Sequence, residues 1–255
     1  MSLDSAVQPP SIVQVAPLES SELDSPQPPI VIFLHGLGGS PENIAMNAVH
    51  PLRQNPAIGP GQVKWILPVA PTITVTGNMG RRMPAWFNIH IFDFPLTIPS
   101  PGEEDEATIL PSIASIEALL TNIVDSGVDP SRIVLGGFSQ GAAMTLLTGL
   151  TTSHKLAGLF VLSARLPLRH RFKSMASSHA SAVPISWGHG TVDPLVPYKL
   201  GRVCADFLMI ELGIPPAKPG SSSGLDFHAY EGLAHYIGDD ELTDLASWLR
   251  NLFSL

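Results

Sequence analysis

Ser139 has the sequence surroundings of a catalytic nucleophile. It lies in the motif GFSQG, residues 137–141, between the apolar run RIVLG and the helix-like run GAAMTLLTGL. A sharp turn from a strand into a helix would hold the serine at the mouth of a sheet with its hydroxyl exposed, and the flanking glycines remove side chains that would collide. The alternative interpretation is a glycine-rich turn in which Ser139 only caps the helix.

Asp193 and His235 are the candidates for the acid and the base that a serine needs, because a hydroxyl is a weak nucleophile at neutral pH. Where a serine lies at such a strand-to-helix turn of an α/β sheet, the acid and then the histidine follow it in the sequence, each on a loop after a later strand. Asp193 follows the run VPISWGHG, and His235 follows LDFHAYEG. Their positions in the chain disfavour the competing histidines and acids, which are His35, His50, His90, His154, His170, His179, His189, His228, Asp226, Asp239 and Asp240.

Two backbone N–H groups are expected to stabilise the oxyanion that forms when a carbonyl is attacked. Gln140 lies at the predicted helix N-terminus, where backbone donors face a developing negative charge. The second predicted donor is Leu37 in the segment HGLGG, which follows the strand-like run IVIFL, with Gly38 as the fallback. The alternative for this segment is an ordinary glycine-rich loop.

The elements that must position these residues alternate between strand-like and helix-like segments. Continuous apolar runs bounded by Gly or Pro predict strands that are buried on both faces. The alternation predicts an α/β fold, a mostly parallel sheet whose ligands bind beyond the carboxyl ends of the strands. The predicted strands are IVIFLHG, KWILPVAP, RIVLGGFS, LAGLFVLS, VPISWGHG and LDFHAYEG, and the predicted helices are 104–126, 141–150, 198–212 and 239–252.

Composition excludes several functional classes. The 255 residues carry 22 acidic and 14 basic side chains, for a net charge of −8. This charge, with no long run of Lys or Arg, argues against a nucleic-acid surface and against a polybasic membrane patch. The single cysteine, Cys204, excludes an intramolecular disulfide and a Cys-based zinc site and suits a reducing compartment. Because we find neither a secretory signal nor about 18 uninterrupted apolar residues, we expect a soluble cytoplasmic protein without stable membrane insertion.

Residues 1–29 differ in composition from the rest of the chain. They contain six prolines, four acids and no Gly, Lys or Arg, which predicts a flexible tail, although the apolar stretch 11–15 could dock as an edge strand. Residues 30–255 form the predicted catalytic domain. Within it, the acidic run of residues 103–106 predicts a solvated loop that leads into a helix, where negative charge suits the helix dipole.

Six motifs that follow one another from about Ile30 to Phe253 resemble those of the acyl-protein thioesterases, the lysophospholipase-like carboxylesterases of the α/β-hydrolase fold. The motifs are FLHGLGG, RMPAWFNI, GGFSQGAA, KLAGLFVLSARLPLR, HGTVDPLVP and EGLAH. The resemblance implies one α/β-hydrolase domain with helices on both faces of the sheet and no large cap domain. It also implies a serine hydrolase that removes fatty acyl groups from protein cysteines and cleaves oxygen esters such as those of lysophospholipids.

The resemblance also implies the roles of individual residues. The family's triad corresponds to Ser139, Asp193 and His235, and its oxyanion donors correspond to Leu37 and Gln140. An acyl channel is implied along the loop 78–89 and the segment after the fourth predicted strand, with the residues Met83, Trp86, Phe87, Arg165, Leu166 and Pro167. Arg165 departs from the family, since Ala164-Arg165 stands where members commonly carry Cys-Trp, and a cation in an apolar wall would narrow or polarise the channel.

The mechanism implied by these residues needs no metal or organic cofactor, because its intermediate is covalent and backbone amides stabilise its charge. The expected partners are acylated proteins, lysolipids or small esters, and the expected state is a monomer or weak homodimer in the cytoplasm, with the nucleus as a second location. Two alternatives stay open. One is a general carboxylesterase for short or medium esters, favoured if Arg165 closes the channel, and the other is a non-catalytic binding protein of the hydrolase fold.

Overall fold

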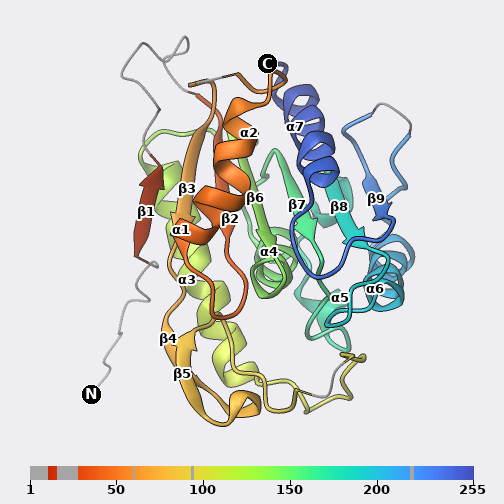
Figure 1. Cartoon of the computed structure of the whole chain (residues 1–255). Coiled ribbons are helices and arrows are strands. Elements are labelled where there is room, and N and C mark those ends of the chain that lie inside the picture. The colour runs from red at the N-terminus through yellow and green to blue at the C-terminus, as the bar shows by residue number, and fades with distance from the viewer. Residues whose placement is uncertain (1–10, 16–27, 60, 93–94, 219–220) are drawn as a thin grey trace.

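A seven-stranded sheet forms the centre of the computed structural model, which describes residues 11–15, 28–59, 61–92, 95–218 and 221–255 (Figure 1). The strand order is β1-β3-β2-β6-β7-β8-β9; β1 pairs antiparallel with β3, and the other neighbours are parallel. The strands are β1 (Ile12–Val15), β2 (Ile30–Leu34), β3 (Lys64–Pro68), β6 (Ile133–Phe138), β7 (Gly158–Leu162), β8 (Ile185–Gly190) and β9 (Leu225–Tyr230), and a separate antiparallel hairpin joins β4 (Thr72–Val75) to β5 (Arg81–Pro84).

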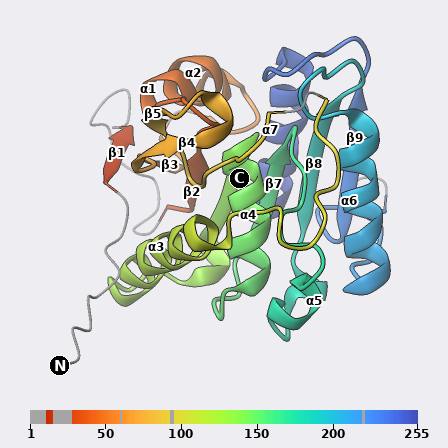
Figure 2. The ribbon, with the colours of Figure 1, turned by 90° about the horizontal axis from the view of Figure 1, so that it is seen from below.

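Helices cover both faces of this sheet. Figure 2 shows α1, α2 and α7 on one side and α3, α4 and α6 on the other. The predicted α/β class with a mostly parallel sheet is therefore confirmed. The helices are α1 (Pro41–Ile44), α2 (His50–Gln54), α3 (Glu106–Asp125), α4 (Gln140–Thr151), α5 (Phe172–Met175), α6 (Tyr198–Glu211) and α7 (Asp239–Phe253), with a π-helical segment (Ala45–Val49) and short 3₁₀ turns (Thr76–Asn78, Pro130–Arg132 and Ala180–Ala182).

Two apolar cores explain why the strand sequences are continuously apolar. Alternate side chains of a strand point to opposite faces of the sheet. On β2, Ile32 packs into the core formed with α3, α4 and α6, while its neighbours Val31 and Phe33 pack into the core formed with α1, α2 and α7. All five residues of β2 are buried in this way, and β7 repeats the pattern.

The sequence did not predict some of the strands and helices. The β4–β5 hairpin is largely exposed and has no apolar run, so periodicity could not indicate it. The helical stretch from Pro41 to Gln54 is interrupted by its π-helical segment and by Pro51, which blur the helical spacing. Strand β1 lies within the stretch left open as an edge strand, whereas residues 1–10 and 16–27 of the predicted tail lie outside the described residues.

Helix α3 is long and apolar enough, by length and composition, to cross a membrane, and it is the one such helix among the described residues. A core helix passes the same test. Ile109, Ile116, Leu119 and Leu120 of α3 are buried in the core that the helix shares with α4 and the sheet. These contacts account for the apolar character of α3 by packing within the domain.

Glu241, in the first turn of α7, is a carboxyl group almost fully removed from water, with 1% of its surface exposed. Its Oε2 accepts a hydrogen bond from the Gly238 N–H at 3.3 Å, and its Oε1 has no hydrogen-bond partner among the described residues. A Cβ on Gly188 of β8 would lie 2.3 Å from Oε1, so the carboxyl fills the space that this glycine leaves. Burial raises the pKa of Glu241 to about 7.

Replacing Glu241 with Gln is expected to stabilise the protein increasingly as the pH rises. Because the folded-state pKa is raised, the folded state holds the proton more tightly, and the wild type loses stability between about pH 4.5 and about pH 7. The difference in unfolding free energy between E241Q and the wild type should grow by about 3 kcal/mol over this interval. Urea denaturation at several pH values measures this difference, and Asp240→Asn, at an exposed residue of the same helix, is the control. A difference between E241Q and the wild type that does not change with pH would contradict the raised pKa of Glu241.

Candidate active site

Ser139 occupies a tight turn between the end of β6 and the start of α4. Its φ of 56° and ψ of −118° lie in a region that non-glycine residues rarely adopt. A Cβ on Gly137 would lie 2.4 Å from the carbonyl carbon of Gly141, and a Cβ on Gly141 would lie 2.2 Å from the backbone oxygen of Leu34 on β2. The two glycines therefore let α4 start directly against the sheet, and that close approach holds the serine in its strained conformation.

The structure brings Ser139, His235 and Asp193 together from three different loops. His235 Nε2 lies 2.9 Å from Ser139 Oγ, and His235 Nδ1 lies 2.7 Å from Asp193 Oδ2. With Nδ1 donating to the carboxylate, Nε2 is the acceptor for the serine proton. The ring of Phe138, which precedes the serine, packs against the His235 ring with centroids 4.9 Å apart. This arrangement can transfer a proton from the serine to the imidazole.

The Asp193 carboxylate is surrounded by hydrogen-bond donors. Its Oδ1 accepts from the N–H groups of Leu195 and Val196, each at 2.9 Å, while Oδ2 faces His235. Burial by itself raises the pKa of Asp193, but the hydrogen bond and charge of His235 and the two backbone donors hold it below its ordinary value. Asp193 is therefore ionised at neutral pH, as a residue that orients a histidine must be.

His189 lies beside this carboxylate but makes a different contact. It is fully buried, its Nε2 donates to the Val196 carbonyl at 2.8 Å, and the same nitrogen is 3.8 Å from Asp193 Oδ2. Burial lowers the pKa of His189, so the ring stays neutral. Its contact fixes the loop that carries Asp193.

Leu37 and Gln140 both line the cavity at Ser139. Gln140 is the first residue of α4, which places its N–H at a helix N-terminus. The N–H of Gly38, the fallback donor, is engaged by the Pro84 carbonyl at 2.8 Å, whereas no backbone carbonyl among the described residues accepts from Leu37. Leu37, unlike Gly38, therefore has a donor left for a substrate oxygen.

The Gln140 side chain has a role that sequence reasoning did not identify. Its Oε1 accepts from the Trp86 N–H at 2.8 Å, and its Nε2 donates to the Phe87 carbonyl at 2.7 Å. The Trp86 indole N–H in turn donates to the carbonyl of His35, at the end of β2. These contacts fasten the segment after β5 to the turn at Ser139.

A cavity of about 190 Å³ opens at Ser139. Of the predicted acyl-binding residues, Phe87 and Arg165 line it. The other predicted residues do not: Met83 contacts Asn78 in the β4–β5 hairpin, and Trp86, Leu166 and Pro167 are buried. Ile89, the last residue of the predicted channel loop, also lines the cavity, and sequence reasoning missed several other apolar lining residues, which are Phe92, Leu96, Phe138, Ala143, Ala164, Leu195 and Val196.

The expectation that residues 103–106 form a solvated loop is wrong for two of its acids. The Glu104 side chain is 6% exposed and pairs with Arg165, and the Asp105 side chain is 15% exposed and pairs with His90. Composition could not indicate this, because the partner of Glu104 lies 61 residues away in the sequence.

The family model for Phospholipase/Carboxylesterase matches residues 19–253, which is nearly the whole chain. The chain belongs to the phospholipase/carboxylesterase family. Acyl-protein thioesterase 1 of Cryptococcus neoformans var. neoformans is 42% identical over 222 residues, covering 86% of this chain and 90% of the relative. Acyl-protein thioesterase 1 of Saccharomyces cerevisiae is 34% identical over 224 residues, covering 88% and 92%.

Solved structures share the fold of this chain. SOBER1 of Arabidopsis thaliana is 28% identical with a TM-score of 0.76, covering 88% of this chain and 98% of that chain. Acyl-protein thioesterase 2 of Zea mays shares the fold, with a TM-score of 0.71 at 24% identity, covering 95% and 99%. The predicted α/β-hydrolase fold in a single domain is confirmed. Among the described residues, no group of three or more His, Cys, Asp or Glu side chains could hold a metal ion.

Replacing Gly141 with Ala is expected to reduce turnover strongly and also to reduce stability, because the added methyl group meets backbone atoms. The added methyl group meets the backbone of β2 and must displace the start of α4, where Ser139 lies. A misplacement of a reacting group by about 1 Å costs on the order of a hundredfold in rate. Gly149→Ala, on the same helix, is the matched control because its methyl group meets the flexible side chain of Leu159. Ester hydrolysis and thermal unfolding of both variants test this. Equal losses of kcat in the two would contradict a specific role for the turn.

Proposed function

We propose that this chain is a serine hydrolase that removes acyl groups from protein cysteines and also cleaves acyl oxygen esters, with Ser139, His235 and Asp193 as its catalytic triad. The observation that carries the proposal is the continuous hydrogen-bonded sequence from Ser139 Oγ through His235 to Asp193, at 2.9 and 2.7 Å, beside a cavity with an apolar lining. The related proteins named acyl-protein thioesterase 1 support the choice of thioester substrates.

The proposed reaction proceeds through a covalent acyl-enzyme. Ser139 Oγ attacks the carbonyl carbon while His235 Nε2 takes the serine proton, and the N–H groups of Leu37 and Gln140 stabilise the oxyanion. The tetrahedral intermediate expels the thiol or alcohol, which leaves with the proton from His235. Water then gives its proton to His235 and attacks the acyl carbon, and Ser139 leaves with the proton as the carboxylic acid is released.

The ionised Asp193 contributes by stabilising the imidazolium that forms in both stages. Its lowered pKa keeps the carboxylate charged across the neutral range, and its two backbone donors keep it from rotating away from His235. No metal or organic cofactor enters this chemistry, since the residues described provide nucleophile, base and charge stabilisation. The cytoplasmic location and the monomeric or weakly dimeric state stay predictions.

A second candidate keeps the chemistry and changes the substrate. Arg165 lines the cavity at Ser139, and its cation among apolar residues favours esters of short or medium chains over long fatty acyl groups. In that case the protein is a general carboxylesterase. Peptide thioesters and oxygen esters with acyl chains of increasing length distinguish the two, because activity confined to the shortest chains would exclude the first proposal.

Intact mass after exposure to a fluorophosphonate tests the nucleophile. The wild type is expected to gain one adduct and Ser139→Ala none, because the reagent captures only an activated serine. Asp193→Asn should react and hydrolyse esters about 10³- to 10⁴-fold more slowly, since the histidine then loses the tautomer that accepts the proton. Ser131→Ala, at an exposed serine, is the control that should react like the wild type. A Ser139→Ala protein that gains the same adduct would place the nucleophile elsewhere.

A further inference from the structure

The cavity at Ser139 borders a second cavity of about 240 Å³. The two share part of their walls, formed by Phe87, Ile89, Leu96 and Arg165. Their remaining surfaces differ in character. The first is mostly apolar, whereas the second is lined by polar groups that include His90, Glu103, Glu104 and Asp105. The charged member of the shared wall is Arg165.

Arg165 is held in this wall by Glu104. Its Nη1 lies 2.6 Å from Glu104 Oε1, and the two side chains are 13% and 6% exposed. The second carboxylate oxygen of Glu104 accepts from the Leu168 N–H at 2.7 Å. Both carboxylate oxygens of Glu104 are therefore engaged, one by the Arg165 guanidinium and one by the backbone of the loop that carries Arg165. Separating a pair this deeply buried costs free energy, because the charge of each partner would be left without compensation.

The loop that carries Arg165 has an unusual backbone. Ser163 and Leu168, on either side of Arg165, have φ values of 53° and 51°, in the left-handed region that favours glycine. Such strain persists only where the surroundings determine the conformation. The hydrogen bond from Leu168 to Glu104 and another from the Leu166 N–H to Cys204 Sγ, at 3.3 Å, provide these surroundings.

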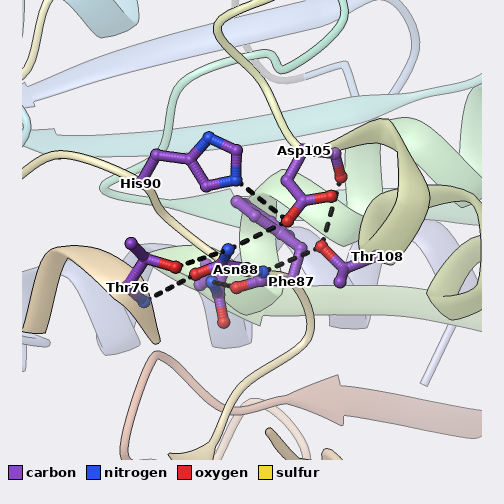
Figure 3. A network of polar contacts seen from close by, with 7 residues as sticks. Thr76, Phe87, Asn88, His90, Asp105 and Thr108 are labelled. Carbon is purple, nitrogen blue, oxygen red and sulfur yellow. Dashed lines mark hydrogen bonds and ion pairs between the residues drawn. The ribbon is translucent and has the colours of Figure 1, made fainter. Parts of the chain in front are cut away.

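A polar network holds the other side of the wall (Figure 3). Asp105, next to Glu104, accepts hydrogen bonds from Asn88 Nδ2 at 2.9 Å and from His90 Nε2 at 3.1 Å. The Asn88 N–H donates to Thr108 Oγ1 on α3, and the Asn88 side chain also bonds Thr76. These contacts tie the segment that includes Phe87 and Ile89 to the start of α3, where Glu104 and Asp105 lie.

We infer that the Arg165–Glu104 ion pair ends the acyl pocket, so that medium-length acyl groups are cleaved more efficiently than palmitoyl groups; this rests on the proposed function. Arg165 is the specificity-determining residue, and Glu104 is the residue that positions it. Each methylene buried in the apolar cavity raises kcat/KM by about fourfold. A chain that reaches the guanidinium gains nothing more, because burying hydrocarbon there would take the charged pair out of its polar surroundings.

Acyl-chain profiles of variants test this inference. We would measure kcat/KM for p-nitrophenyl esters from butyrate to palmitate, and for octanoyl and palmitoyl peptide thioesters. The main variant is Arg165→Met with Glu104→Gln, which removes both charges and joins the two cavities through an apolar side chain. We expect its optimum to move to longer chains, with the palmitoyl-to-octanoyl ratio rising at least about tenfold. Glu104→Gln alone should move the ratio in the same direction, since it leaves Arg165 without its anchor.

Arg171→Met is the matched control, because it removes the neighbouring, more exposed ion pair with Glu106 outside the two cavities. Its profile should match the wild type. If the double variant folds and its acyl-chain profile matches that of the wild type, the Arg165–Glu104 pair is only a structural contact and the inference is overturned. A wild type that cleaves palmitoyl as efficiently as octanoyl substrates would overturn it without any variant. Failure of the wild type to hydrolyse every ester and thioester is a different result, which would overturn the proposed function itself.

Discussion

The close packing of the turn at Ser139 against β2 determines where the other residues of the candidate site lie. Because Gly137 and Gly141 leave no side chain between α4 and the sheet, Ser139 is held at a positive φ. The same turn places the Gln140 N–H at the start of α4, and the Gln140 side chain fastens the segment that includes Phe87. One backbone geometry thus positions the proposed nucleophile, a proposed oxyanion donor and a wall of the cavity at Ser139.

Three buried carboxyl groups show how their surroundings set their roles. Asp193 meets His235 and two backbone donors, which keep it charged. Glu104 meets a guanidinium and one N–H, which fix it as an anchor for Arg165. Glu241 meets a single N–H and is almost fully removed from water, and its pKa rises to about 7. The number and charge of the neighbouring donors therefore differ among the proposed catalytic carboxyl, the proposed positioning carboxyl and the carboxyl of Glu241.

The sequence predicted the elements and residues whose signals are local. Strands such as β2 and β7 are buried on both faces, so their apolar runs identify them, and GFSQG lies directly between a strand and a helix. The cavity walls were harder to predict because they depend on distant pairs. The contact of Glu104 with Arg165 joins positions 61 residues apart, and the acidic run around Glu104 has the composition of an exposed loop. The exposed β4–β5 hairpin carries no periodic signal either.

We propose that the turn at Ser139 aligns its hydroxyl with the Leu37 and Gln140 amides and with a cavity that ends at Arg165. A crystal structure of the protein with an octyl phosphonate bonded to Ser139 tests this alignment. We predict a phosphonyl oxygen within hydrogen-bond distance of both amide nitrogens and the octyl chain in the cavity, directed toward Arg165. A phosphonyl oxygen that contacts neither amide, or an octyl chain that leaves along another surface, would contradict this alignment.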